Sequence, residues 1–121
     1  MEDIFILEDD KIYQRMLESQ IPEGLTHVLA KDGKEFDEYL AGDGRARLYF
    51  LDDRVPSASG RMQFLFITHC SKLLEKQPGA KVFYTGSTPW VNEKEYCKEN
   101  KIPMVDRGSI ADIIKSELET K

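Results

Sequence analysis

The chain has few of the residues that build disulfide frameworks or metal-thiolate sites. It contains two cysteines among 121 residues, Cys70 and Cys97, and they do not have the spacing of metal ligands. We therefore expect two reduced thiols in a cytoplasmic protein. No apolar run approaches the ~20 residues that span a bilayer, and the N-terminus has no signal-peptide pattern. These absences predict a soluble chain without a membrane partner.

A basic surplus is also absent. Lysine and arginine number 17 and aspartate and glutamate 22, which gives a net charge of −5. A general phosphate-backbone binder normally has a basic excess, so nucleic acid is not an expected partner. Glycine and proline are too few and too scattered for a linker, and 40% of the residues are apolar. The length and composition predict one globular domain over residues 1–121.

Short apolar runs alternate with amphipathic stretches along the chain. Runs bounded by charged or turn-forming residues predict strands that are buried on both faces of a sheet. Five strands are expected: Ile4–Leu7, Leu25–Ala30, Leu48–Leu51, Lys81–Tyr84 and Ile102–Val105.

The stretches between these strands carry apolar residues at helical spacing. Asp10 can cap the first helix, and Thr88 followed by Pro89 is typical of a helix start. The expected helices cover residues 11–20, 34–40, 62–75, 89–100 and 110–118, with a loop at 56–60. Alternating strands and helices predict an α/β fold with a doubly wound, five-stranded parallel sheet.

Acidic residues follow two of the expected strands. Glu8 and Asp9 end the first strand, and Asp52 and Asp53 end the third. Ligands of such sheets bind beyond the carboxyl ends of the strands, where these carboxylates would converge. A divalent cation offsets the repulsion of clustered carboxylates, and Mg²⁺ prefers oxygen ligands. We therefore expect a Mg²⁺ site at this edge. The same acids argue against a flavin phosphate there, and no P-loop is present.

These motifs resemble the receiver domain of bacterial two-component response regulators. The matching residues are Glu8-Asp9 after strand one, Asp52 after strand three, Pro56 and Gly60 at successive intervals of four, and Thr85 ending strand four. The resemblance covers nearly the whole chain. It implies a flavodoxin-like sheet with strand order 2-1-3-4-5 and a stand-alone signalling domain rather than an enzyme, one that assists its own phosphorylation and dephosphorylation.

The resemblance implies a phosphoryl acceptor at Asp52. Mg²⁺ would be bound by Asp9 and Asp52 directly, by Glu8 through water, and by the backbone carbonyl of Arg54. The phosphoryl donor would be a sensor histidine kinase or a phosphotransfer protein, and output would pass to an unknown downstream protein.

Two further positions of the resemblance concern the phosphoryl group itself. Thr85 would hydrogen-bond a phosphoryl oxygen. The family's lysine after strand five is missing, and Arg107 is the expected replacement, with Asp106 as the alternative by a one-residue shift.

Other positions are expected to modulate the site or transmit its state. Asp53, Arg54 and Ser87 lie where family members tune the lifetime of the phosphoryl group. The aromatic switch residue of strand five is missing, so Met104, with Tyr84 and Trp90, is expected on the output face. Because the lysine and this aromatic residue are both missing, a pseudo-receiver that binds proteins without phosphorylation is the alternative function.

Overall fold

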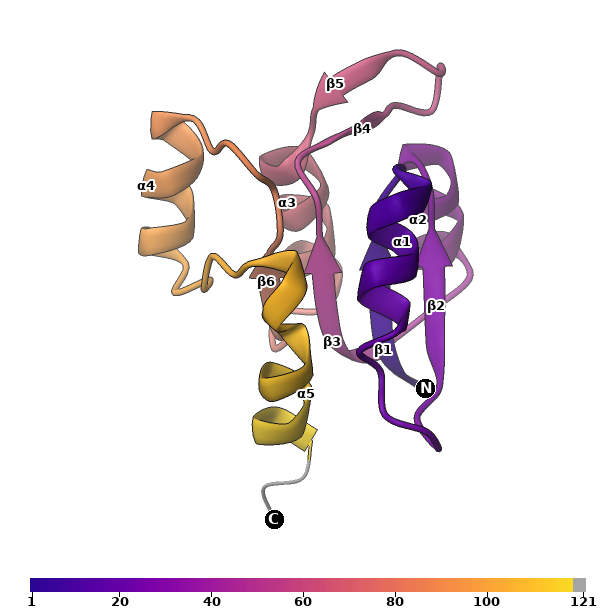
Figure 1. The fold of residues 1–121 in the computed structure, drawn as a ribbon. Helices are drawn as coiled ribbons and strands as arrows, with labels where there is room; N and C mark the ends of the chain where they lie inside the picture. The colour runs from indigo at the N-terminus through magenta and orange to yellow at the C-terminus, as the bar shows by residue number, and fades with distance from the viewer. Residues whose placement is uncertain (119–121) are drawn as a thin grey trace.

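Four parallel strands form the central sheet of the computed structural model, in the order β2-β1-β3-β6. Residues 1–118 of the chain are described (Figure 1). The elements are β1 (Glu2–Leu7), α1 (Lys11–Glu18), β2 (His27–Ala30), α2 (Gly33–Ala41), β3 (Ala46–Leu51), β4 (Arg54–Pro56), β5 (Met62–Phe64), α3 (Phe66–Lys76), β6 (Val82–Tyr84), α4 (Val91–Glu99), a 3₁₀ turn η1 (Arg107–Ser109) and α5 (Ile110–Leu118).

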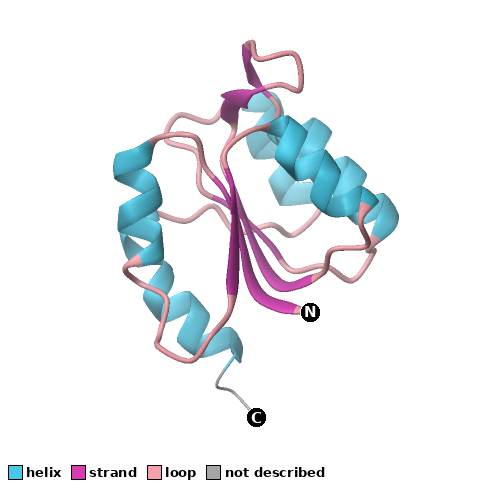
Figure 2. Ribbon diagram, turned by 90° about the vertical axis from the view of Figure 1, so that its right-hand side faces the viewer, coloured by secondary structure: helices cyan, strands magenta, loops and turns pink. Residues whose placement is uncertain are grey.

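Helices cover both faces of the sheet, which Figure 2 shows edge-on between two helical layers. Alternate residues of each strand point to opposite faces, and the two faces form separate apolar cores. Phe5, Tyr49 and Leu51 pack with residues of α2, α3 and α4. Ile6 and Phe50 pack with residues of α1 and α5. The expected α/β, doubly wound parallel architecture is therefore confirmed.

The expected fifth strand, Ile102–Val105, is reduced to one bridge. Met104 pairs with Tyr84 in parallel at the edge of β6, so the segment has the position of strand five without its length. Pro103 has no N–H to donate, and this limits the ladder. The expectation of five full strands was wrong, although the order 2-1-3-4 is as expected.

Residues 54–64 also differ from expectation. Strands β4 and β5 form an antiparallel hairpin where a loop and the first turn of a helix were expected, and α3 begins only at Phe66. The tip is closed by a hydrogen bond from the Ser57 N–H to the Arg61 carbonyl, and Gly60 has a positive φ of 91°. Figure 1 shows this hairpin projecting past the carboxyl end of β3. It therefore stands beside the expected site.

The helices are short. The longest among residues 1–118 is α3, with 11 residues, and none there combines the length and apolar character needed to cross a bilayer.

A buried polar chain ties β3 to α3 and to the preceding loop. The Tyr49 hydroxyl donates to Gln77 Oε1 at 2.6 Å and accepts the Ala46 N–H at 3.0 Å. Gln77 Nε2 in turn donates to the Gly44 carbonyl at 2.8 Å. One hydroxyl thus satisfies two groups that have little access to water.

Tyr49→Phe is expected to lower the free energy of unfolding by about 1–3 kcal/mol, because two buried polar groups lose their partner. Urea denaturation measures this loss. Tyr39→Phe is the matched control: its half-buried hydroxyl donates to Glu2, whose carboxylate water can solvate, so a smaller loss is expected. Equal losses in the two variants would contradict the prediction.

Candidate functional site

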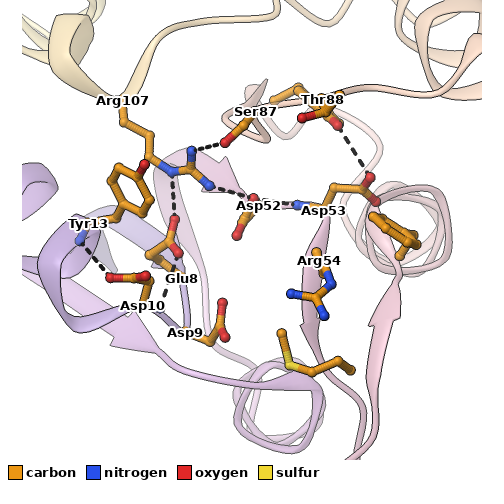
Figure 3. A pocket seen from close by; sticks show the side chains of 13 residues that line it. Glu8, Asp9, Asp10, Tyr13, Asp52, Asp53, Arg54, Ser87, Thr88 and Arg107 are labelled. Carbon is orange, nitrogen blue, oxygen red and sulfur yellow. Dashed lines mark hydrogen bonds and ion pairs between the residues drawn. The ribbon is translucent and has the colours of Figure 1, made fainter.

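A pocket of about 240 Å³ opens at the carboxyl ends of β1 and β3 (Figure 3). Its floor carries Glu8 and Asp9 from the end of β1 and Asp52 and Asp53 from the end of β3. Parallel strands bring their carboxyl ends to one edge of a sheet, and β1 and β3 are direct neighbours. The acids that are far apart in sequence therefore meet here.

Three of these carboxylates form a cluster suited to a divalent cation. One oxygen each from Glu8, Asp9 and Asp52 lies within 4.8 Å of the others. Glu8 and Asp52 are 1% and 4% exposed, so water solvates their charge poorly. Clustered carboxylate oxygens are the donors that hard cations such as Mg²⁺ and Ca²⁺ prefer. The residues present thus fit a divalent metal.

Arg107 reaches into the pocket and binds three partners through its three nitrogens. Nε donates to Glu8 Oε1 at 2.9 Å, Nη2 to Asp52 Oδ1 at 3.0 Å, and Nη1 to Ser87 Oγ at 2.6 Å. The neighbouring Asp106 instead accepts the Gly108 N–H and caps η1. The side chain that meets the acids is therefore that of Arg107, as Figure 3 shows.

Two other residues hold Arg107 in place. The ring of Tyr13 lies under the guanidinium, with Cζ 4.1 Å from the ring centroid, a cation–π contact. Gln20 donates to the backbone carbonyl of Arg107 and accepts the N–H groups of Ile110 and Ala111. α1 thus supplies the stacking ring, and the turn that follows α1 anchors the backbone of η1 and α5.

Burial and mutual repulsion favour the protonated forms of these acids. Burial raises the pKa of Asp52 to about 7, with the Glu8 carboxylate acting in the same direction and Arg107 opposing them. Burial also raises the pKa of Glu8 and of Asp9. Burial acts to lower the pKa of Arg107, but Asp52 and Glu8 outweigh it and raise that pKa. A cation in the pocket therefore keeps its carboxylates ionised.

Asp53 points away from the cluster and connects the site to the helices. Its Oδ1 accepts the Phe66 N–H at the start of α3, and its Oδ2 accepts the Tyr84 hydroxyl at 3.3 Å. Glu93 of α4, which is 3% exposed, shares a hydrogen bond with the Asp53 carboxylate and accepts the Trp90 N–H at 2.7 Å. The contact of Asp53 with this buried acid thus joins β3 to α4.

Thr85 lies beside the pocket rather than in its wall. It is 1% exposed, and its Oγ1 has no hydrogen-bond partner within residues 1–118. It lines a neighbouring hollow together with Tyr13, Ser87 and Arg107, whereas Ser87 and Thr88 line the acidic pocket itself. The structure therefore brings Ser87 to Arg107 and leaves the Thr85 hydroxyl unpaired beside it.

The rim of the pocket is apolar and partly basic. Arg54 is exposed at the start of β4, and Met62 and Phe64 of β5 line the hairpin side. Phe64 stacks edge-to-face on Trp90, with ring centroids 5.5 Å apart. Trp90 and Met104 are exposed, whereas Tyr84 is buried under α3 and α4. The three residues expected on an output face are therefore in different environments.

Sequence reasoning did not identify three residues of this site: Tyr13, Glu93 and Phe64. Tyr13 follows the helix cap Asp10 by three residues, so the sequence places it in the first turn of the helix. Nothing in this spacing indicates its contact with Arg107. Glu93 follows Trp90 by three, the spacing of an acid that caps its own helix. Phe64 was assigned to a helix, so its position at the rim was not foreseen.

Solved structures with the same fold include receiver domains of response regulators. The crystal structure of the phosphorylated cyanobacterial phytochrome response regulator RcpA has a TM-score of 0.80 at 16% identity, covering 99% of this chain and 96% of that one. The signal receiver domain of an HD domain-containing protein from Pseudomonas fluorescens Pf-5 has a TM-score of 0.74 at 14% identity, covering 98% and 94%.

A third similar structure is a response regulator protein from Burkholderia pseudomallei with a phosphorylated aspartic acid, a calcium ion and citrate. Its TM-score is 0.71 at 14% identity, over 99% of this chain and 68% of that one. No protein-family model and no curated protein matches the chain. The chain therefore has the fold of response regulator receiver domains.

The raised pKa of Glu93 predicts a pH-dependent stability. Burial raises the pKa of Glu93 from 4.5 to about 7, and Asp53 acts in the same direction. Between these values the folded chain keeps a proton that the unfolded chain releases, so the free energy of unfolding falls as pH rises through this window. The pKa of Asp52 is also raised, so this residue likewise makes the free energy of unfolding fall as pH rises. Glu93→Gln keeps an acceptor for Trp90 and a donor for Asp53 without ionising.

We expect Glu93→Gln to flatten this fall and to be more stable than the wild type above pH 7 by about 1 kcal/mol. Urea denaturation of both proteins between about pH 5 and pH 8 measures the difference. Parallel stability curves for the two proteins would contradict the role given to Glu93.

Proposed function

We propose that residues 1–121 form a receiver domain that accepts a phosphoryl group on Asp52 from a histidine kinase or phosphotransfer protein. The observation that carries the proposal is the position of the Asp52 carboxylate. It is buried at the floor of the pocket, in contact with both the acidic cluster and a guanidinium.

The two oxygens of Asp52 differ. Oδ1 accepts the Asp53 N–H at 2.8 Å and an Arg107 N–H at 3.0 Å. Within residues 1–118, Oδ2 accepts no hydrogen bond, so it is the free nucleophile. Carboxylates act as nucleophiles of this kind in aspartyl-phosphate chemistry.

In the reaction, Asp52 Oδ2 forms a bond to phosphorus while the N–P bond of a phosphohistidine breaks. The electron pair of that bond stays on the imidazole nitrogen of the donor, which takes up a proton. The product is an aspartyl phosphate, and phosphoryl transfer of this type depends mostly on positioning and on charge neutralisation.

A bound Mg²⁺ would supply charge neutralisation for the transferred phosphoryl oxygens. Asp9 and Asp52 would bind the ion directly, with Glu8 through water and with the backbone carbonyl of Arg54. Arg54 faces Phe64 in a non-hydrogen-bonded pair of the hairpin, because the flanking bonds join Asp53 to Leu65 and Ser57 to Arg61. Its carbonyl is therefore free of the β4–β5 ladder.

Arg107 and Thr85 would stabilise the phosphorylated state. A guanidinium binds phosphoryl oxygens through parallel N–H groups, so Arg107 would move from Asp52 Oδ1 to the new phosphoryl oxygens. The unpaired Thr85 hydroxyl beside it would donate to one of them. Asp53, Arg54 and Ser87 would tune the lifetime, and Met104, Tyr84 and Trp90 would transmit the change to a downstream protein.

Acetyl phosphate with Mg²⁺ is expected to phosphorylate the wild type, because a small donor needs no docking surface. Intact-mass spectrometry measures the added phosphoryl group. Asp52→Asn should not be labelled, since an amide is a poor nucleophile. Asp112→Asn, which removes an exposed acid of α5, is the matched control and should be labelled like the wild type.

No labelling of the wild type, or equal labelling of Asp52→Asn, would refute phosphorylation at this residue. That result would favour the pseudo-receiver. One observation fits that alternative: Arg107 forms ion pairs with both Glu8 and Asp52, so the pocket contains its own cationic partner for these acids.

Arg54→Ala is expected to shorten the lifetime of the aspartyl phosphate by roughly threefold, because the long exposed side chain at the rim limits the access of water. The decay of the labelled protein after removal of the donor measures the lifetime. Arg61→Ala, at the hairpin tip outside the pocket lining, is the control. An unchanged lifetime in Arg54→Ala would refute this shielding, and Arg54 would then only balance the charge of the neighbouring acids.

A further inference from the structure

Arg107 binds carboxylates that a divalent cation would need as ligands. Two of its partners, Glu8 and Asp52, are also two of the three carboxylates of the acidic cluster. The guanidinium side chain is 11% exposed, so its charge is screened weakly by water. A positive ion entering the cluster would meet an existing positive charge a few ångströms away.

The oxygens of Glu8 are both engaged in the present arrangement. Oε1 accepts the Arg107 Nε–H at 2.9 Å, and Oε2 accepts the Asp10 N–H at 3.2 Å. Asp52 Oδ1 is engaged twice, whereas Asp52 Oδ2 is free. A metal ion would therefore share Glu8 with Arg107 or displace it.

Tyr13 fixes the plane of the guanidinium. The ring stacks on Arg107 at 4.1 Å and belongs to the first turn of α1, where the Asp10 carboxylate accepts the N–H groups of Ile12 and Tyr13. A planar guanidinium that donates to Glu8, Ser87 and Asp52 at once needs one orientation, which a compact ammonium could not reproduce. Tyr13 lines the pocket but acts on the acids through Arg107.

We infer that Arg107, held in its orientation by Tyr13, is a built-in cation that competes with Mg²⁺ for Glu8 and Asp52 and weakens metal binding by the unphosphorylated chain. Arg107 is the competing group, and Tyr13 is a positioning residue. The inference rests on the proposed metal site, and it concerns metal affinity rather than phosphorylation.

The experiment is Mg²⁺ titration of the purified full chain by calorimetry, with no phosphoryl donor present. Arg107→Gln is expected to bind Mg²⁺ at least about tenfold more tightly than the wild type, because one buried positive charge is removed beside the ligands. Arg61→Gln removes an exposed charge of the hairpin and should change the affinity by less than about twofold.

Tyr13 provides a matched pair of variants. Tyr13→Leu removes the ring and should tighten Mg²⁺ binding by roughly two- to fivefold, whereas Tyr13→Phe keeps the ring and should stay within about twofold of the wild type. A purely structural role of Tyr13 would lower metal affinity in the leucine variant instead.

A second measurement observes Mg²⁺ binding by the wild type directly. In ¹H–¹⁵N spectra of the wild type, saturating Mg²⁺ should shift the Arg107 Nε–H signal, which the spectrum of Arg107→Gln identifies. An unshifted signal would overturn the competition, and so would equal, weaker or absent Mg²⁺ binding in Arg107→Gln.

The two proposals fail separately. If acetyl phosphate does not label the chain but Arg107→Gln binds Mg²⁺ more tightly than the wild type, only the phosphoryl-acceptor role is refuted. If acetyl phosphate labels the chain but Arg107→Gln binds Mg²⁺ no more tightly than the wild type, only the inferred competition between Arg107 and Mg²⁺ is refuted.

Discussion

The ion pairs of Arg107 with Glu8 and Asp52 are the interaction on which the site depends. Buried carboxylates that lie this close repel one another, and burial already raises the pKa of both. The guanidinium offsets that repulsion and joins the ends of β1 and β3 to the turn before α5. The Tyr13 ring and the Gln20 side chain then fix the guanidinium from α1 and from the turn after it.

A second set of hydrogen bonds connects the residue after Asp52 to the surrounding helices. Its neighbour Asp53 bonds the start of α3, the Tyr84 hydroxyl and the Glu93 carboxyl of α4. These contacts link the end of β3 to α4, whose N-cap residue Trp90 forms an exposed aromatic pair with Phe64 of β5. Phe64 also lines the pocket, so the pocket and this exposed surface share a residue.

Most of the architecture was predictable because its signal is local. Buried strands such as Phe50-Leu51 and helix caps such as Asp10 have recognisable patterns, and the structure confirms the elements that they indicate. The hairpin was missed because Met62 and Phe64 are apolar yet exposed, so the segment resembled the start of an amphipathic helix. The fifth strand was overestimated because Pro103 interrupts a ladder that the apolar run alone would allow.

The sequence by itself determined the fold class, because alternating strands and helices are short-range patterns. Its resemblance to receiver domains supplied the strand order and Asp52 as the expected phosphoryl acceptor. Only the tertiary structure shows that the Arg107 side chain enters the pocket while Asp106 caps η1, because neighbouring residues of a turn can point in either direction. It alone paired Arg107 with Tyr13 and Glu93 with Asp53. These contacts join residues 40 or more positions apart, and no local pattern encodes them.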